Sequence, residues 1–315
     1  MRWFGFGFNA FGQINGEKLA EGACSGAEKE VKVTSPTELT SHADGHSCMC
    51  LAGFGITSES RGVTEKESHG CEDASIGESY LTLAFPDRLE CWDLTGCKVH
   101  FLLLSGPTLN LPLVPGGYIG AKPPFYRSLS PHLKAKSLAL SAEHAVLLGA
   151  SGAVYTWGLG RHGQLGHGGL TSEEEPRAVE ALGGMPMSYV ATGSWHSMGV
   201  TFMCGAGMKV ASWDFHHAIL TQVFISIQAF PALLDVSPSC ELMAVSCGSR
   251  HTAAVTTTGD LYTWGWGEYG QLGHQSLMST DEPQCVEFFR EQKMRVIDVV
   301  CGPWNTFAAV KEEVA

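Results

Sequence analysis

The residues with the clearest chemical potential in this chain form a glycine-rich loop that occurs twice. The two copies are Gly158-Leu159-Gly160-Arg161-His162-Gly163 and Gly265-Trp266-Gly267-Glu268-Tyr269-Gly270. Both have the Gly-x-Gly-x-x-Gly spacing that holds a dinucleotide when it lies between a strand and a helix. The segment after the first copy, Gln164-Leu165-Gly166-His167, is a poor helix start, and a cofactor site is rarely duplicated in one chain. The loops therefore indicate structural turns, and we expect no cofactor.

Histidines are the next candidates, because imidazole nitrogens transfer protons and bind metals. His144, His196 and His251 occupy the same position in successive repeats. Equivalent residues of separate repeats lie well apart, so we expect buried imidazoles that are hydrogen-bonded within each repeat. The densest set of potential ligands, Asp214-Phe215-His216-His217, lacks the distant third histidine of a metal oxygenase. The sequence offers no catalytic or metal-binding residues, and we predict that the protein is not an enzyme.

Charge and cysteine content exclude further classes. The net charge is −12, with only 20 Lys and Arg residues, so direct binding to nucleic-acid phosphates is not expected. Eleven cysteines without paired Cys-x-x-Cys units predict reduced core thiols and a nuclear or cytoplasmic setting. Residues 1–13 lack the apolar core of a signal peptide, and no run of 18 apolar residues occurs. We expect a soluble protein with no membrane partner.

Internal repeats determine the predicted fold. The run from Glu143 to His167 recurs 107 residues later, where Tyr155-Thr156-Trp157-Gly158 becomes Tyr262-Thr263-Trp264-Gly265. Gly193-Ser194-Trp195-His196 lies near the middle of this offset, so the repeating unit has about 50 residues. Short apolar and alternating segments separated by glycine turns predict four strands in each unit. A ring of such units is a β-propeller.

The pattern predicts one all-β domain over residues 1–315, with about six, or six to seven, four-stranded blades. Clear repeats cover residues 139–201 and 227–310, whereas residues 16–138 form degenerate blades. Residues 1–15 match the second half of a unit and the C-terminus matches the first half, so strands from both ends should close the last blade. Residues 202–224 are an off-pattern insert with a makeshift strand at 207–213, so one blade is expected to be incomplete.

These units resemble the repeats of the regulator of chromosome condensation family, on the pattern Tyr-x-Trp-Gly-x-Gly-x-x-Gly-Gln-Leu-Gly. The resemblance implies a scaffold that binds proteins in the nucleus or on chromosomes, with some of it in the cytoplasm. It also implies association with a JmjC-type histone lysine demethylase and a role in histone methylation and chromosome segregation. The alternative that it implies is guanine-nucleotide exchange on a small GTPase, the activity of the family's founding member.

Candidate partner-binding residues lie between the loop glycines, where a repeated frame carries different side chains. They are Arg161 and His162 in the first loop, and Glu268 and Tyr269 in the second. The acidic runs at residues 173–175 and 312–313 are expected to be solvated, and recognition of a basic partner such as a histone tail is the alternative.

Overall fold

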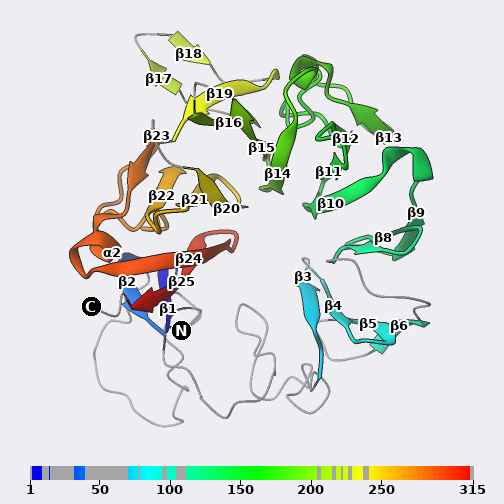
Figure 1. Cartoon of the computed structure of the whole chain (residues 1–315), viewed down its shortest axis with the longest axis horizontal. Helices are drawn as coiled ribbons and strands as arrows, with labels where there is room; N and C mark the ends of the chain where they lie inside the picture. The colour runs from blue at the N-terminus through cyan, green and yellow to red at the C-terminus, as the bar shows by residue number, and fades with distance from the viewer. Residues whose placement is uncertain are drawn as a thin grey trace.

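The computed structural model describes residues 2–8, 14, 32–39, 70–76, 79–93, 98–103, 111–203, 207–214, 218–220, 223–225, 229–236 and 241–312. These residues form antiparallel sheets that follow one another around a ring, so the predicted β-propeller is confirmed (Figure 1). The described helices are short: 3-10 turns at Pro131–Leu133 and Glu180–Leu182, and α2 at Glu287–Glu291. None of them is long and apolar enough to span a membrane.

Six sheets of the described residues make up the ring, five with four strands and one with three. The first contains β3 (Asp73–Ile76), β4 (Tyr80–Ala84), β5 (Arg88–Asp93) and β6 (Lys98–Leu103). The second contains β7 (Leu113–Val114), β8 (Gly117–Ile119) and β9 (Tyr126–Ser128). The third contains β10 (Ala135–Leu140), β11 (His144–Gly149), β12 (Val154–Gly158) and β13 (Glu173–Ala178). The fifth contains β20 (Leu242–Cys247), β21 (His251–Thr256), β22 (Leu261–Gly265) and β23 (Thr280–Cys285).

The fourth blade contains the off-pattern residues. Strand β16 (Gly207–Asp214) pairs with β15 (His196–Met203) at eight positions, and β14 (Met187–Thr192) and β19 (Ala232–Asp235) flank this pair. The strand expected there is confirmed, but the expectation that this blade is incomplete is wrong. The blade has four strands although it lacks the Trp-Gly motif, because strand pairing uses backbone groups. A hairpin of β17 (Ala218–Leu220) and β18 (Val223–Ile225) lies between β16 and β19 in the chain. Among the described blades, the one with only three strands is β7–β9.

The last blade joins the two ends of the chain, with the strand order β2-β1-β25-β24. Strand β1 (Arg2–Phe8) lies between β2 (Lys32–Glu38) and β25 (Asn305–Glu312), and β24 (Met294–Cys301) forms the edge of the sheet opposite β2. Arg2 faces Val310 in the register, and Phe6 enters a buried cluster with Val296. The predicted closure of the last blade by both ends is therefore confirmed. Figure 1 shows the two termini on the same side of the ring.

One glycine position explains why β1 resembles the third strand of the clear repeats. Gly7, at the second-last position of β1, and Gly158 and Gly265, at the ends of β12 and β22, have φ values of 115°, 108° and 104°. A Cβ atom at these positions would lie 2.6, 2.4 and 2.4 Å from a carbonyl oxygen of the facing turn. Only glycine accommodates both the positive φ and this close approach. The aromatic-Gly pattern at the N-terminus thus reflects the same local geometry as Trp-Gly in the repeats.

The repeated histidines connect each blade to the next one. All three are buried, and each Nε2 atom lies within hydrogen-bond distance of a hydroxyl oxygen of the following blade. The pairs are His144 with Ser197 (2.7 Å), His196 with Thr252 (3.0 Å) and His251 with Thr306 (2.9 Å). Their structural role agrees with the sequence analysis, but the expected partner within the same blade is wrong for Nε2. Each histidine begins the second strand of its blade, where it adjoins the next blade in the ring.

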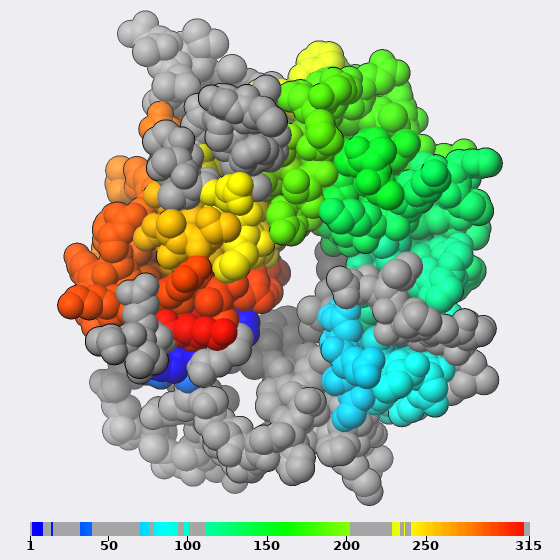
Figure 2. Space-filling model, viewed as in Figure 1, coloured from blue at the N-terminus to red at the C-terminus, as the bar shows by residue number. Residues whose placement is uncertain are grey.

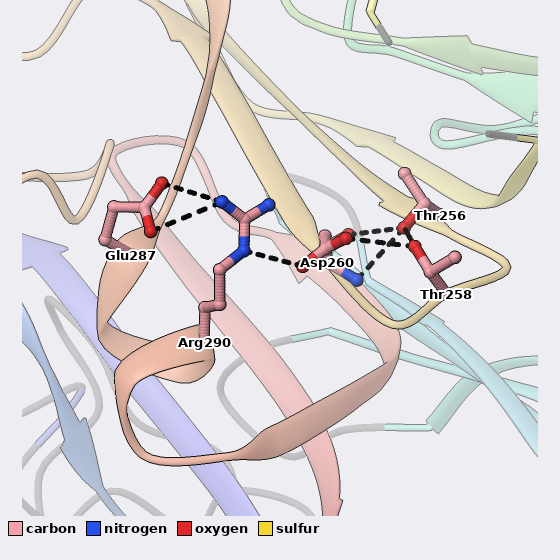
Figure 3. A network of polar contacts seen from close by, with 5 residues as sticks. All are labelled: Thr256, Thr258, Asp260, Glu287 and Arg290. Carbon is pink, nitrogen blue, oxygen red and sulfur yellow. Dashed lines mark hydrogen bonds and ion pairs between the residues drawn. The ribbon is translucent and has the colours of Figure 1, made fainter. Parts of the chain in front are cut away.

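A second polar network connects the turn between β21 and β22 with α2, which leads into the last blade (Figure 3). Asp260, in the turn between β21 and β22, accepts hydrogen bonds from Thr258 (2.9 Å) and Arg290 (3.2 Å). Arg290 also pairs with Glu287 at 3.1 Å, and both lie on α2, whose Phe289 is buried in the core of the closing blade. Because the ion pairs are largely exposed, each should contribute about 1 kcal/mol or less. The network mainly orients the connection into β24.

Candidate protein-interaction face

The two glycine-rich loops follow the third strands β12 and β22. Turns and the outer strands β13 and β23 come after them, and no helix does, as expected for structural loops. A buried glutamine holds each loop: Gln164 Oε1 accepts a hydrogen bond from the His162 backbone N–H (2.8 Å), and Gln271 Oε1 accepts one from Tyr269 (3.0 Å). This explains the Gly-Gln-Leu-Gly motif, which fixes the backbone while the preceding side chains face outward.

The turns between first and second strands lie beside these loops. Backbone hydrogen bonds connect the loops with the turns. In each case the N–H group of the residue after the glycine of the third strand donates to a carbonyl oxygen in the turn, that of the residue before the histidine position. The pairs are Glu143 with Leu159 (2.8 Å), Arg250 with Trp266 (2.8 Å) and Trp304 with Phe8 (2.9 Å). Loops and turns of successive blades therefore belong to one face of the ring.

Between the third and fifth blades, this face combines charged and aromatic side chains. Exposed Arg161 approaches Glu143 at 3.9 Å. The ring centroid of His162 lies 6.2 Å from that of Trp195, in the next blade. The Arg250 guanidinium lies over the same Trp195 ring, with Cζ 4.4 Å from the centroid. Trp195 thus connects the loop of one blade with the turn of another.

An aromatic cluster continues the face into the closing blade. The centroid of Trp266 is 5.0 Å from Tyr269 and 5.1 Å from Trp304, while Tyr269 and Trp304 are 5.8 Å apart. Phe8 packs on Tyr269 at 5.0 Å, and Lys32 Nζ lies 5.5 Å from the Tyr269 centroid. The four rings are half-buried, and Lys32 is exposed. We use the term interaction band for Phe8, Lys32, Glu143, Arg161, His162, Trp195, Arg250, Trp266, Glu268, Tyr269 and Trp304.

The structure places all four sequence-predicted residues in this band but does not gather them at one point. Arg161 and His162 lie on the third blade, and exposed Glu268 and half-buried Tyr269 lie on the fifth, with the fourth blade between them. Trp195, Arg250 and Trp304 were not predicted. The sequence could have indicated them, because they occupy the position before the histidine in successive repeats. As in the glycine-rich loops, the residue type at this position varies while the residues around it are repeated. That the band binds a partner remains a prediction.

A hollow of about 480 Å³ adjoins the band at the centre of the ring, where Figure 2 shows an opening among the blades. The residues that precede the band positions line it, including Ser194, Ser249 and Pro303. Ser194 Oγ and Ser249 Oγ lie 3.0 Å apart and connect two of the turns. Among the lining residues described, Lys122 is the one with a charged side chain.

The remaining candidates have structural positions. Residues 173–175 lie on β13, the outer edge strand of its blade, where charge and the neighbouring Pro176 oppose pairing with another strand. Within the described ranges, no group of three or more His, Cys, Asp or Glu side chains has a metal-binding arrangement. Residues 215–217 of the histidine-containing cluster, and residue 313 of the acidic tail, lie outside those ranges. Five described cysteines are free thiols: Cys71, Cys91, Cys247, Cys285 and Cys301.

Comparison with known proteins extends the sequence pattern to the whole chain. The regulator of chromosome condensation (RCC1) repeat model matches residues 151–200 and 258–309, and a second model of this repeat matches residues 244–271. The mouse RCC1 domain-containing protein 1 is 37% identical over 376 residues, which cover 98% of this chain and 97% of the mouse protein. This chain belongs to the RCC1 repeat family.

Two further matches agree with membership of the RCC1 family. Human RCC1 domain-containing protein 1 is 36% identical over 377 residues, which cover 99% of this chain and 97% of that protein. The crystal structure of Prp20p from Saccharomyces cerevisiae, a protein described by its binding properties to Gsp1p and histones, matches with a TM-score of 0.51 at 16% identity. This match covers 94% of the chain and 63% of Prp20p, and it supports the RCC1 propeller fold alone.

Proposed function

We propose that this RCC1-family propeller is a non-catalytic protein-interaction scaffold that acts as a nuclear or chromosomal adaptor. The observation that carries the proposal is the interaction band, where half-buried tryptophan and tyrosine rings and exposed arginines share one face. Trp, Tyr and Arg are the residues that most often dominate the binding energy of protein interfaces. A ring whose blades are connected by buried hydrogen bonds holds such a face rigid, which lowers the entropic cost of binding.

The proposed partner is a JmjC-type histone lysine demethylase, and binding it would support control of histone methylation and chromosome segregation. Similarity over nearly the full length of the RCC1 domain-containing protein 1 of mouse and human supports a shared role with those proteins. Nucleus and chromosome, with some of the protein in the cytoplasm, are the compartments that fit this role. Histones are a second partner class under this proposal, since Prp20p, which shares the fold, is described as a protein with binding properties to histones.

The experiment is a capture from nuclear extract with this chain as bait, read by mass spectrometry. We expect a JmjC oxygenase at near-stoichiometric amounts, and its loss with a bait that carries Trp195→Ala and Trp304→Ala. A bait with Lys136→Glu, at the far end of β10 from the turn that contributes to the band, is the matched control, and thermal melting verifies that all three fold.

Two outcomes would contradict the adaptor proposal. One is capture of a nucleotide-free small GTPase in place of the demethylase, together with faster nucleotide release from the nuclear GTPase in an exchange assay. That result would favour the alternative of guanine-nucleotide exchange. The other is capture of the demethylase by the wild-type and the tryptophan variant in equal amounts, which would show that the interaction band does not bind the demethylase.

A further inference from the structure

Two cations of the interaction band lie over aromatic rings without a carboxylate partner among the described residues. Arg250 Cζ is 4.4 Å from the Trp195 centroid, and Lys32 Nζ is 5.5 Å from the Tyr269 centroid. Both cations are exposed. The third cation of the band, Arg161, has Glu143 at 3.9 Å. Among the residues that the structure describes, Arg250 and Lys32 are therefore positioned by rings and not by ion pairs.

A cation stacked on a ring retains its hydrogen-bond donors. The Arg250 Cζ atom lies over the Trp195 ring, and no side-chain hydrogen bond among the described residues uses the N–H groups of its guanidinium. A planar fork of this kind matches the two oxygens of a carboxylate. Because the ring already restricts the side chain, less rotamer entropy is lost when the carboxylate binds.

An apolar surface connects the two cations. The backbone N–H of Trp266 donates to the Arg250 carbonyl oxygen at 2.8 Å, and the Trp266 ring lies 5.1 Å from that of Trp304. Trp304 in turn lies 5.8 Å from Tyr269, over which the Lys32 ammonium lies. A segment that crosses this path meets a cation, then two indole rings, then a second cation.

The central hollow adjoins this path. The described lining residues include Lys122 and no Asp or Glu. Of the serine hydroxyls that line it, Ser141 donates to the His144 carbonyl oxygen, and Ser194 and Ser249 hydrogen-bond to each other. The band contains two carboxylates, exposed Glu268 and half-buried Glu143, the second of which pairs with Arg161, against three cations. On a chain whose net charge is −12, this face has a local excess of cations.

We propose that the interaction band binds an acidic, partly apolar segment of a partner protein. One carboxylate pairs with Arg250, a second pairs with Lys32, and an apolar side chain between them packs on Trp266 and Trp304. This inference rests on the proposed scaffold function and names the chemistry of the partner. It differs from the alternative that the acidic runs at residues 173–175 and 312–313 suggest, which is a basic partner such as a histone tail.

The test uses fluorescein-labelled peptides of about 12 residues and fluorescence polarisation at about 50 mM and about 300 mM NaCl. One peptide alternates Glu with Leu and Phe, a second replaces Glu with Lys, and a third replaces Leu and Phe with Gly. We expect the acidic apolar peptide to bind about tenfold or more tightly than either of the others, and to weaken at the higher salt concentration.

Variants assign the contacts. Arg250→Glu combined with Lys32→Glu should weaken the acidic apolar peptide by about tenfold or more, whereas Lys136→Glu should leave its affinity unchanged. Equal affinity for the lysine peptide, unchanged affinity in the double variant, self-association in place of peptide binding, or no binding of any peptide would each overturn the inference. Circular dichroism of every variant verifies that the fold is retained.

The same double variant separates this inference from the proposed function. If wild-type and double variant capture the demethylase from nuclear extract equally, the function stands and the acidic-segment assignment is wrong. If wild-type captures no demethylase, the function is wrong, and the peptide measurements still decide whether the band recognises acidic segments.

Discussion

Deleting residues 1–39 should abolish the cooperative unfolding transition of the protein. The deletion removes β1 and β2, two of the four strands of the closing blade, and leaves β25 as an unpaired edge. It also removes Phe4, Phe6 and Val33 from the cluster that contains Val296. Loss of a large apolar core side chain costs about 2–5 kcal/mol, so three such losses reach the total stability of about 5–15 kcal/mol of a typical protein. Thermal melting followed by circular dichroism measures the effect.

A rearranged chain is the matched control for this deletion. Residues 2–39 are moved behind β25 through a short Gly-Ser linker, in a chain that otherwise begins at residue 40. Because Arg2 lies opposite Val310 in the antiparallel register, the linker replaces a hairpin turn and both strands regain their places. We expect a cooperative transition near that of the wild-type. A deletion variant as stable as the wild-type would show that the ends do not close the ring.

Acidification should lower the stability of the fold well before its carboxylates are protonated. Burial lowers the pKa of His144 and His251 from 6.5 to about 3. The unfolded chain binds these protons first, so stability decreases as the pH falls from 6.5 towards 3 and is unaffected by these groups above 6.5. Each histidine should cost about 2–3 kcal/mol between pH 6.5 and pH 4.5. Urea unfolding at a series of pH values measures the slope.

Substitution separates these histidines from other titrating groups. His251→Gln should remove about half of the histidine contribution to the change in unfolding free energy between pH 6.5 and pH 4.5. At pH 7.5 it should also lower the unfolding free energy by about 1–3 kcal/mol, because Thr306 loses a hydrogen-bond partner. Leu170→Gln, at an exposed position without a titratable group, is the control and should change neither value. An unchanged slope in the His251 variant would contradict the buried, neutral state of this imidazole.

The sequence was sufficient for the ring and its closure because both depend on local geometry that is repeated. Gly158 and Gly265 recur at one offset, and the same steric requirement at Gly7 identifies β1 as a third strand. For the blade around β16, only a makeshift strand at 207–213 could be predicted and not the complete blade, since its pairing with β15 uses the backbone and leaves no motif. The hydroxyl partners of the histidines were also missed, because Ser197 and Thr306 belong to the following repeat and comparison of units does not show contacts between them.

The candidate face was predicted in part. Comparison of the repeats identified Arg161 and Tyr269, because these loop positions differ in residue type between otherwise similar units. Trp195 and Arg250 also lie at positions that differ between units, but in turns outside the glycine loops, and they were missed. Lys32 lies in a segment without a repeat, so its position over Tyr269 depends on the ring closure and is visible only in three dimensions.

Hydrogen–deuterium exchange of this chain with a purified JmjC-type demethylase tests most directly the claim that the interaction band is a docking face. We predict slower exchange in the turns around Trp195, Arg250 and Trp304 and in the loops at residues 159–163 and 266–270. The turns at the opposite ends of the same blades, residues 150–153 and 257–260, should be unchanged. Protection confined to those opposite turns, or none at a demethylase concentration that saturates capture, would contradict the account.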